Sequence, residues 1–218
     1  RVGVLGCASF AKRAMIPAML QCGAVKLTAV ASRTKDRAQE FAKAFACEAV
    51  VGYEDLLSRR DIEAVYMPLP TGLHQEWVTK ALEAGKHLLV EKSFAEDLAS
   101  SKKMVSDARR KNLLVMENYL FPHHSQYKWI KDFMDSGELG DIHLIRSTFG
   151  FPPLAEDSFR YNKKLGGGAM LDAGGYVVKI VRLLLGDDVA LLGSALQYNG
   201  DLGVDIYGDA MFKNAQGQ

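Results

Sequence analysis

The sequence predicts an α/β protein in which a doubly wound parallel sheet is followed by an α+β domain with an open, mostly antiparallel sheet. Up to about residue 122, short apolar runs bounded by turn signals alternate with stretches of helical period, which is the pattern of βαβ units. Beyond Pro122 the order changes to a helix, a strand, a loop rich in Pro, Asp and Gly, a second helix and two alternating segments. We therefore expect two domains, residues 1–122 and residues 123–218.

The expected strands of the first domain are short and apolar throughout, as in a sheet that is buried on both faces. They cover residues 2–5, 27–31, 64–67, 87–90 and 113–117. The intervening segments are predicted as helices, with Thr34 as the N-cap of one and Gly85 at the end of another. Connections of this kind between parallel strands are right-handed crossovers.

The second domain is predicted from residues 123–218. Its helices are expected at residues 126–135 and about 168–185, and its strands at residues 142–150, 190–198 and 205–213. The chain lacks an initiator Met and stops just after strand-like alternation. We expect both ends to be cut and the C-terminal part of this domain to be missing.

The composition is that of an ordinary globular protein, with 218 residues of which 48% are hydrophobic. The 27 basic and 26 acidic residues leave a net charge of +1, which provides no basic field for nucleic acid or an anionic membrane. No charged leader and no apolar stretch approaching about 18 residues is present, so a soluble cytoplasmic protein is expected. The cysteines Cys7, Cys22 and Cys47 form no CxxC pair and are expected to be free buried thiols, without a disulfide framework or a metal site.

A dinucleotide-binding turn is predicted directly after the first strand. A G-x-G-x-x-G turn belongs at this position, and the residues there are Gly6, Cys7, Ala8, Ser9, Phe10 and Ala11. Alanine replaces the second and third glycines, yet a tight turn at Gly6 still points amides and a helix N-terminus at cofactor phosphates. The sequence thus indicates a Rossmann NAD(P) site, the alternative being a plain strand-to-helix turn without a ligand.

The end of the second strand favours NADP(H) over NAD(H). An Asp or Glu here would bind the adenosine ribose hydroxyls, but the segment contains Ser32, Arg33 and Thr34. The two hydroxyls can donate to a 2′-phosphate, and Arg33 can pair with it or stack on adenine. Arg37, also expected to bind the cofactor, lies one helical turn further on. The alternative is that both arginines are solvated charges at a helix start.

Three further motifs resemble the Gfo/Idh/MocA family of pyranose and inositol oxidoreductases. They are PTGLH at residues 70–74, EKS at residues 91–93 and GGGAMLDAGGY at residues 166–176. The segments VYMPLP at residues 65–70 and MENYLFPHH at residues 116–124 are most similar to those of the nucleotide-sugar 3-ketoreductases of deoxysugar biosynthesis. Dihydrodiol and xylose dehydrogenases are the next most similar branch.

The resemblance implies a Rossmann domain followed by an open-faced antiparallel sheet, in chains considerably longer than 218 residues. The open face is covered by another subunit in the family, so a homodimer or homotetramer is expected. The resemblance also implies a small-molecule sugar or nucleotide-sugar substrate.

The resemblance implies roles for individual residues. Lys92 would lie at the nicotinamide and hydrogen-bond the reacting sugar oxygen; family members usually have Pro after this lysine, often in a cis peptide, where this chain has Ser93. His74 would lie near the nicotinamide ribose. The other residues expected around the cofactor are Leu69, Pro70, Thr71, Glu91 and Asn118.

Asp172, Tyr176 and Lys179 are spaced i, i+4, i+7, so on an α-helix they project within about 60° of one another. The alternative is a solvated polar face stabilised by helix-surface pairs. By resemblance, Asp172 and Tyr176 face the nicotinamide. Tyr176 would protonate the alkoxide formed by hydride transfer from NADPH, while Lys92 polarises the carbonyl and Asp172 orients sugar hydroxyls or the lysine.

Four further residues are expected to contact substrate, and the first is Lys179 on the helix that carries Tyr176. Arg160 and Tyr161, in the loop before the glycine run, are candidates for substrate or cofactor phosphate, the alternative being a surface pair. His124 is expected to line the cleft together with His123, and two adjacent histidines do not make a metal site.

The predicted function is that of an NADP(H)-dependent oxidoreductase that reduces a keto group, or oxidises a secondary alcohol, of a sugar or nucleotide sugar. A dihydrodiol or D-xylose dehydrogenase is one alternative. A second is a dinucleotide-binding module without turnover, because fold alone does not secure function. A third is one half of a bifunctional chain.

Overall fold

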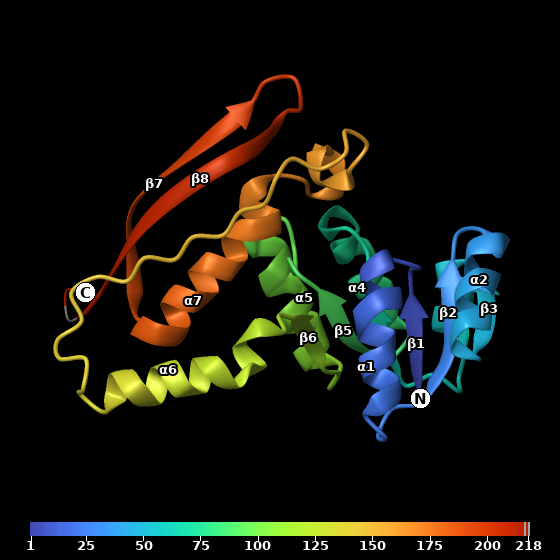
Figure 1. Cartoon of the computed structure of the whole chain (residues 1–218). Coiled ribbons are helices and arrows are strands. Elements are labelled where there is room, and N and C mark those ends of the chain that lie inside the picture. Colours follow the sequence, from blue (N-terminus) through green and yellow to red (C-terminus); the bar gives the residue numbers. More distant parts are fainter. Residues whose placement is uncertain (216, 218) are drawn as a thin grey trace. The chain divides into compact units, whose positions relative to one another are not determined.

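The structure is a computed structural model that describes residues 1–215 and residue 217. The chain forms two compact units, Arg1–Asn118 and a second unit that begins at Tyr119 (Figure 1). The division falls close to the domain boundary expected after residue 122. Each unit is described by itself.

The first unit is built on a six-stranded sheet whose strands are all parallel, as predicted. The strands, in the order β3-β2-β1-β4-β5-β6 across the sheet, are β1 (Val2–Leu5), β2 (Leu27–Ser32), β3 (Glu48–Val51), β4 (Ala64–Met67), β5 (His87–Glu91) and β6 (Val115–Asn118). Five of them were predicted. The sixth, β3, was missed because it is a short edge strand whose residues are largely exposed, so its sequence lacks the apolar character of the inner strands.

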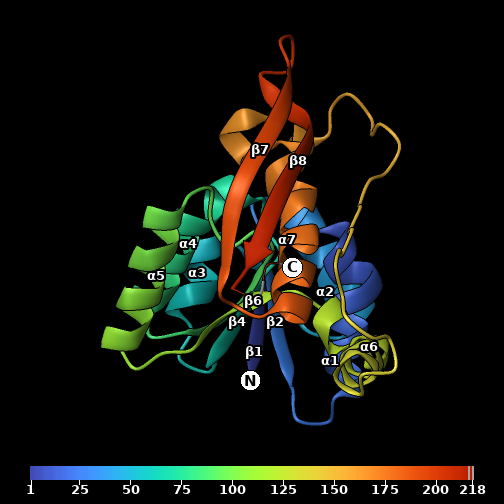
Figure 2. The same ribbon diagram turned by 90° about the vertical axis from the view of Figure 1, so that its left-hand side faces the viewer.

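Helices cover both faces of this sheet. One face carries α1 (Ile16–Gln21), which continues a π-helical segment, η1 (Ala11–Met15), and α2 (Lys35–Phe45). The other face carries α3 (Tyr53–Ser58), α4 (His74–Glu83), preceded by the 3₁₀ turn η2 (Thr71–Leu73), and α5 (Leu98–Arg110) (Figure 2). This arrangement is the predicted doubly wound fold. Thr34 is the N-cap of α2 and Gly85, with a φ of 73°, follows the end of α4, both as predicted.

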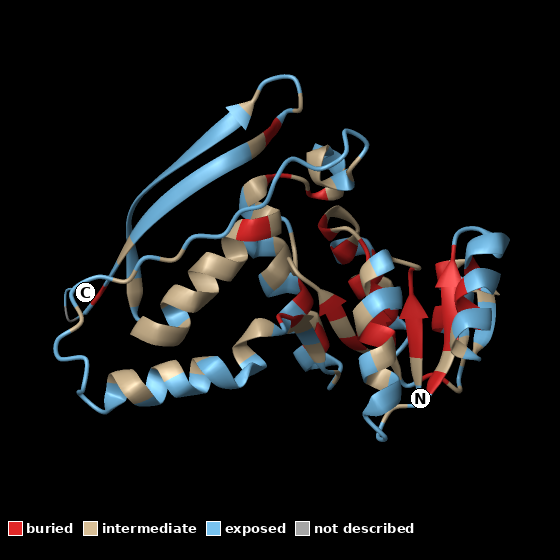
Figure 3. Ribbon diagram, viewed as in Figure 1, coloured by how far each residue is buried: buried red, intermediate tan, exposed pale blue. Residues whose placement is uncertain are grey.

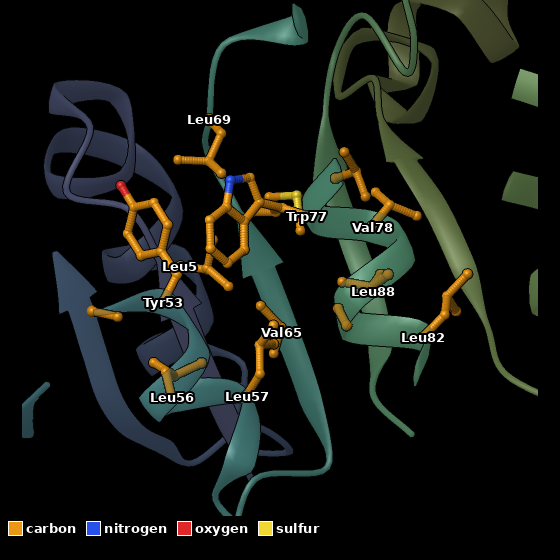
Figure 4. Close-up of a cluster of buried hydrophobic side chains, with 14 of the residues drawn as sticks. Leu5, Tyr53, Leu56, Leu57, Val65, Leu69, Trp77, Val78, Leu82 and Leu88 are labelled. Carbon is orange, nitrogen blue, oxygen red and sulfur yellow. The ribbon is translucent and has the colours of Figure 1, made fainter. Parts of the chain in front are cut away.

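Alternate strand residues divide between two hydrophobic cores. Leu5 and Met67 face the core under α3, α4 and α5, whereas Val4 and Tyr66 face the core under α1 and α2. In the first of these cores Trp77 packs edge-on against Tyr53 with ring centroids 4.9 Å apart (Figure 4). Each large side chain buried in this way contributes about 1.5–3 kcal/mol, and the buried residues concentrate around the parallel sheet (Figure 3).

The second unit contains a helical part and a long hairpin. Its helical elements are η3 (Phe121–His123), α6 (Ser125–Asp135), η4 (Phe159–Tyr161), η5 (Lys163–Leu165), the π-helical η6 (Met170–Gly174) and α7 (Gly175–Leu185). The hairpin pairs β7 (Val189–Asn199) with β8 (Val204–Asn214) in antiparallel register. Both helices and both hairpin strands were predicted with similar bounds.

The strand predicted at residues 142–150 is wrong, because the structure has no strand there. Its alternating side chains suit a strand, but a strand needs a neighbour for its backbone N–H and C=O groups. Among residues 1–215 and 217, none pairs with this segment.

The three cysteines are free, as predicted, but the expectation that they are buried is wrong. Cys22 is exposed at the end of α1, and Cys7 and Cys47 are partly exposed. Within the described part of the chain, no helix is both long and apolar enough to traverse a lipid bilayer.

Candidate functional site

The predicted cofactor residues gather at the carboxyl edge of the parallel sheet. Gly6 follows β1, Ser32 ends β2, Leu69 follows β4, Lys92 follows β5 and Asn118 ends β6. Because the strands are parallel, these positions share one edge. The strand order reverses direction between β1 and β4, and open α/β sheets bind ligands at such a switch point.

The turn after β1 leaves no room for a side chain at Gly6. Gly6 has a φ of 120°, and a Cβ there would lie 2.8 Å from Cδ2 of Leu69. Its amide donates to the Ala31 carbonyl at 3.0 Å, which ties the turn to β2. The amide of Lys12 then donates to the Ala8 carbonyl at 3.1 Å, so the amides just before it precede the first helical hydrogen bond. These amides are suited to an anion such as a pyrophosphate.

The end of β2 has hydroxyl and guanidinium groups where an acidic residue would select NAD. Ser32 is buried, and its Oγ accepts a hydrogen bond from the Thr34 amide at 3.4 Å. Arg33 is exposed and lies beside Tyr53, whose pKa is raised because burial disfavours the phenolate, an effect that the Arg33 charge partly opposes. No residue of this segment carries a carboxylate.

Arg37 supports the dinucleotide turn. Its Nη2 donates to the Cys7 carbonyl at 3.3 Å and its Nη1 lies 3.2 Å from Oε2 of Glu40. Lys12 contacts the other oxygen of Glu40 at 2.6 Å, and both cations lie over the ring of Phe41. The pKa of Glu40 is lowered chiefly by its hydrogen bond with Lys12. Sequence reasoning missed Glu40, because an exposed glutamate on a helix gives no signal of which cations it joins.

The segment that carries Lys92 is held from two sides. The Lys92–Ser93 peptide bond is cis. The Ser93 carbonyl lies 2.9 Å from Nδ1 of His74, and the Phe94 amide donates to Oε1 of Glu117 at 2.9 Å. Glu117 was not singled out as a site residue, although it lies inside a motif that carries the family resemblance.

Glu91 joins three neighbouring strands. Its Oε1 accepts the hydroxyl proton of Tyr66, on β4, at 2.7 Å and the side-chain amide of Asn118, on β6, at 2.6 Å. Tyr66 is fully buried, and its pKa is raised first by that burial and then by the charge of Glu91. Tyr66 was also missed, because it lies in an apolar strand and nothing in the sequence shows where its hydroxyl points.

In the second unit, Asp172 is paired with Arg160. The Nε of Arg160 donates to Oδ2 of Asp172 at 2.8 Å, and only 12% of the Asp172 side chain is exposed. The glycine run allows this approach, since the amide of Gly168 donates to the Arg160 carbonyl at 2.9 Å. Asp205, at the start of β8, accepts the amide of Met170 at 2.6 Å. The helix that carries Asp172 is thereby tied to the loop and to the hairpin.

Tyr176 lies in an aromatic cluster. Its ring centroid is 5.2 Å from Tyr119, 5.7 Å from Phe121 and 5.0 Å from Phe149. The Nζ of Lys179 lies 4.8 Å from the Tyr119 ring centroid, so Tyr176 and Lys179 contact the same ring. Packing of this kind holds the phenol in one orientation.

The stripe predicted for Asp172, Tyr176 and Lys179 assumed a uniform α-helix, and this assumption is wrong. Asp172 belongs to the π-helical η6, while Tyr176 and Lys179 belong to α7. A π-helical turn holds more residues than an α-helical one, so the angle of about 60° does not apply across residue 174. Both segments nevertheless form one continuous helical run.

The remaining predicted residues have structural partners. The Tyr161 hydroxyl accepts the Leu154 amide at 2.8 Å, and His124 caps α6 by accepting the Gln126 amide at 3.2 Å. Leu69 and Thr71 are buried. Within residues 1–215 and 217 there is no group of three or more His, Cys, Asp or Glu side chains that could hold a metal ion.

The predicted cofactor residues thus lie together in the first unit, whereas the predicted catalytic residues are divided between the units. Lys92 belongs to the first, and Asp172 and Tyr176 to the second. That these three side chains meet around a substrate stays a prediction.

Family profiles match almost the whole chain. An oxidoreductase family with an NAD-binding Rossmann fold, GFO_IDH_MocA, matches residues 1–119. A GFO/IDH/MocA C-terminal domain matches residues 127–218.

Similar proteins carry more specific names. The chain is 46% identical over 217 residues to a dTDP-3,4-didehydro-2,6-dideoxy-alpha-D-glucose 3-reductase from Saccharopolyspora spinosa, covering 100% of this chain and 65% of that protein. A D-xylose 1-dehydrogenase (NADP(+)) from Haloferax volcanii is 33% identical, covering 84% of this chain and 57% of that protein. The chain therefore spans about two thirds of the length of the first relative.

A crystal structure with the same fold comes from a 3-ketoreductase of Actinomadura kijaniata in complex with NADP and TDP-benzene. It superimposes with a TM-score of 0.97 at 41% identity, covering 100% of this chain and 67% of that one. Forms of that enzyme with a substituted lysine and with a substituted tyrosine have also been crystallised with both ligands.

Proposed function

Because this chain belongs to the Gfo/Idh/MocA family of oxidoreductases, we propose that it binds NADP(H) and reduces a keto group of a nucleotide sugar, of the dTDP-linked kind. The observation that carries this proposal is the match of the whole chain, at 41% identity, to a 3-ketoreductase in complex with NADP and TDP-benzene. The site at the carboxyl edge of the sheet supports it.

The residues of the first unit fit NADP(H). The amides after Gly6 would face the pyrophosphate, and Ser32, Arg33 and Thr34 would face the 2′-phosphate. The turn at Gly6 between β1 and the first helix and the absence of an acid at residues 32–34 are the features that match this cofactor. When bound, NADPH supplies the hydride for the carbonyl carbon.

The chain's own residues would move the proton. Tyr176 would donate its phenol proton to the alkoxide oxygen as the carbonyl is reduced, held in orientation by its aromatic neighbours. Lys92 would place a positive charge at the same oxygen and stabilise the charge that develops there. Asp172, oriented by Arg160, would accept hydrogen bonds from sugar hydroxyls.

The test is oxidation of NADPH by the full-length protein with a panel of dTDP-linked and free keto sugars. Lys92→Ala and Tyr176→Phe should each lower kcat by at least about 100-fold, within the usual contribution of general acid catalysis, and leave the Kd for NADPH within about threefold. Lys131→Ala, at an exposed position on α6, is the matched control for Lys92→Ala and should retain activity.

Three results would contradict the proposal. Full activity of both variants would remove Lys92 and Tyr176 from the mechanism. Binding of NADPH without oxidation by any carbonyl substrate would favour a dinucleotide-binding module. Activity confined to xylose or to a dihydrodiol would instead favour the dehydrogenase branch, whose members are about 30% identical to this chain.

The cofactor preference has its own test. Arg33→Ala should raise the Kd for NADPH by about 10- to 100-fold, which is the loss of affinity expected when a charge-assisted hydrogen bond to a phosphate is removed. The Kd for NADH should stay unchanged. Equal losses for the two cofactors would show that Arg33 does not bind the 2′-phosphate.

We further propose that the protein is soluble and cytoplasmic and forms a homodimer or homotetramer in which another subunit covers the hairpin. Large apolar side chains are exposed along β7 and β8, and contiguous exposure of this kind marks an interaction surface. They are Leu191, Leu192, Leu196, Tyr198, Ile206 and Met211. Sedimentation of the full-length protein at several concentrations measures its oligomeric state, and a strictly monomeric protein would refute this assignment.

A further inference from the structure

His74 is a fully buried histidine surrounded by backbone carbonyl groups. It is the first residue of α4 and is 0% exposed. Its Nε2 lies 2.8 Å from the Leu69 carbonyl oxygen, while its Nδ1 lies 2.9 Å from that of Ser93 and 3.3 Å from that of Phe94. The imidazole therefore lies between the segment after β4 and the segment after β5.

The position of these contacts in the chain connects them to the proposed reaction. Ser93 follows Lys92 directly, so a bond to its carbonyl restrains the backbone from which the lysine side chain extends. On the other side, Leu69 lies next to the dinucleotide turn, since a Cβ added at Gly6 would lie 2.8 Å from its Cδ2. Because the ring is fully buried and both of its nitrogens face backbone carbonyls, we expect it to act through these neighbours and not by direct contact with the nicotinamide ribose, the location that the resemblance implies.

Carbonyl oxygens accept hydrogen bonds and cannot donate them, so each contact needs an N–H on the ring. A neutral imidazole has one N–H, and burial lowers the pKa of His74, which favours that neutral form. Two of the oxygens, those of Ser93 and Phe94, converge on Nδ1, whereas Nε2 faces one. The carbonyl oxygens therefore create a more negative potential at Nδ1 than at Nε2, and this favours the proton of the neutral ring on Nδ1.

We propose that His74 is a positioning residue for Lys92, donating from Nδ1 to the Ser93 carbonyl and thereby fixing the lysine at the carboxyl edge of the sheet. This inference rests on the proposed function for its catalytic consequence. The contact itself rests on the geometry of the first unit alone.

Two substitutions separate the two sides of the ring. The side-chain amide nitrogen of asparagine lies about where Nδ1 does, and that of glutamine about where Nε2 does. In the full-length protein His74→Asn should keep kcat within about threefold of the parent, whereas His74→Gln should lower kcat by about 10- to 100-fold, the usual cost of a catalytic group displaced by about 1 Å. The KM and the Kd for NADPH should stay within about threefold in both.

A second measurement does not depend on activity. Amide hydrogen exchange of residues 91–95, followed by mass spectrometry, should be faster in His74→Gln than in the parent and close to the parent in His74→Asn. His87 provides matched controls, because it lies at the opposite end of β5 and its Nδ1 accepts the Leu114 amide at 3.0 Å. His87→Asn and His87→Gln should change neither exchange at residues 91–95 nor kcat.

The outcomes separate the inference from the proposed function. If both His74 variants lose kcat and melting temperature to the same extent, the histidine has only a structural role and the inference is wrong. Parental exchange and parental kcat in His74→Gln would also overturn it. If the parent oxidises NADPH with no keto sugar, the proposed function fails, and faster exchange in His74→Gln alone would still support the contact with Ser93.

Discussion

A methyl group at Gly167 would meet backbone atoms that cannot rotate away. A Cβ there would lie 2.5 Å from the carbonyl oxygen and 2.9 Å from the carbonyl carbon of Arg160, and 2.9 Å from the amide nitrogen of Asn162. The neighbouring amides of Gly167 and Gly168 donate to the carbonyls of Asn162 and Arg160 at 3.0 and 2.9 Å. Relief of the overlap therefore requires a shift of the whole loop and weakens both hydrogen bonds.

The expected cost of Gly167→Ala follows from two opposing contributions. Overpacking costs about 1–3 kcal/mol, while the loss of glycine freedom in the unfolded chain offsets about 0.4–1 kcal/mol. The free energy of unfolding should fall by about 1–2 kcal/mol, and the melting temperature by about 4–8 °C for each kcal/mol in a unit of roughly 100 residues.

Differential scanning calorimetry and urea denaturation measure this change. Gly200→Ala is the matched control, because nothing lies within 4 Å of its added methyl group and its φ is outside the left-handed region. It should leave stability unchanged or raise it by up to about 1 kcal/mol. A Gly167→Ala protein that melts with the parent or above it would refute the packing argument.

Three further predictions concern a tyrosine, a histidine and a cysteine. Tyr66→Phe removes a hydrogen bond to the Glu91 carboxylate and should lower the free energy of unfolding, measured in urea, by about 1.5–3 kcal/mol. A loss below about 0.5 kcal/mol would show that water replaces the tyrosine hydroxyl. Burial lowers the pKa of His74 in the folded protein, so near pH 6.5 the unfolded chain binds more protons than the folded one. The contribution of His74 therefore makes the free energy of unfolding rise as the pH rises through that value. A urea midpoint that is no less pH-dependent in His74→Asn than in the parent would contradict this contribution. Partial burial raises the pKa of the Cys7 thiol to about 11. At pH 8 iodoacetamide should therefore modify the exposed Cys22 at least about tenfold faster than Cys7, as followed by mass spectrometry, and equal rates would refute this assignment.

The sequence predicts the first unit well because its signals are local. The apolar runs, the turn at Gly6 and the helix signals at Thr34 and Gly85 each depend on neighbouring residues, and the structure confirms them. Strand β3 is absent from the prediction because an exposed edge strand has no apolar signature.

Features that depend on distant partners are not predictable in this way. Residues 142–150 have strand-like alternation, but whether a strand forms depends on a neighbour that the sequence does not specify. The π-helical η6 changes the angular spacing of side chains after Asp172, and the residue types of this segment do not predict a π-helix.

The candidate site follows the same division. The family resemblance names Lys92, Glu91 and Asn118, and their positions at strand ends follow from the topology, while their roles stay predictions. The partners Tyr66 and Glu117 were missed, because their roles depend on which strands are adjacent and which way each side chain points.

Because Tyr66 and Asn118 donate to the same oxygen of Glu91, residues 66, 91 and 118 should evolve together and not as three independent positions. A change at any one leaves the others with an unmatched donor or acceptor, so their effects should be strongly non-additive. Libraries that randomise these positions separately should recover almost only the parental residues. Libraries that vary them jointly should yield compensating triplets, and recombination between relatives should preserve function when all three positions come from the same parent.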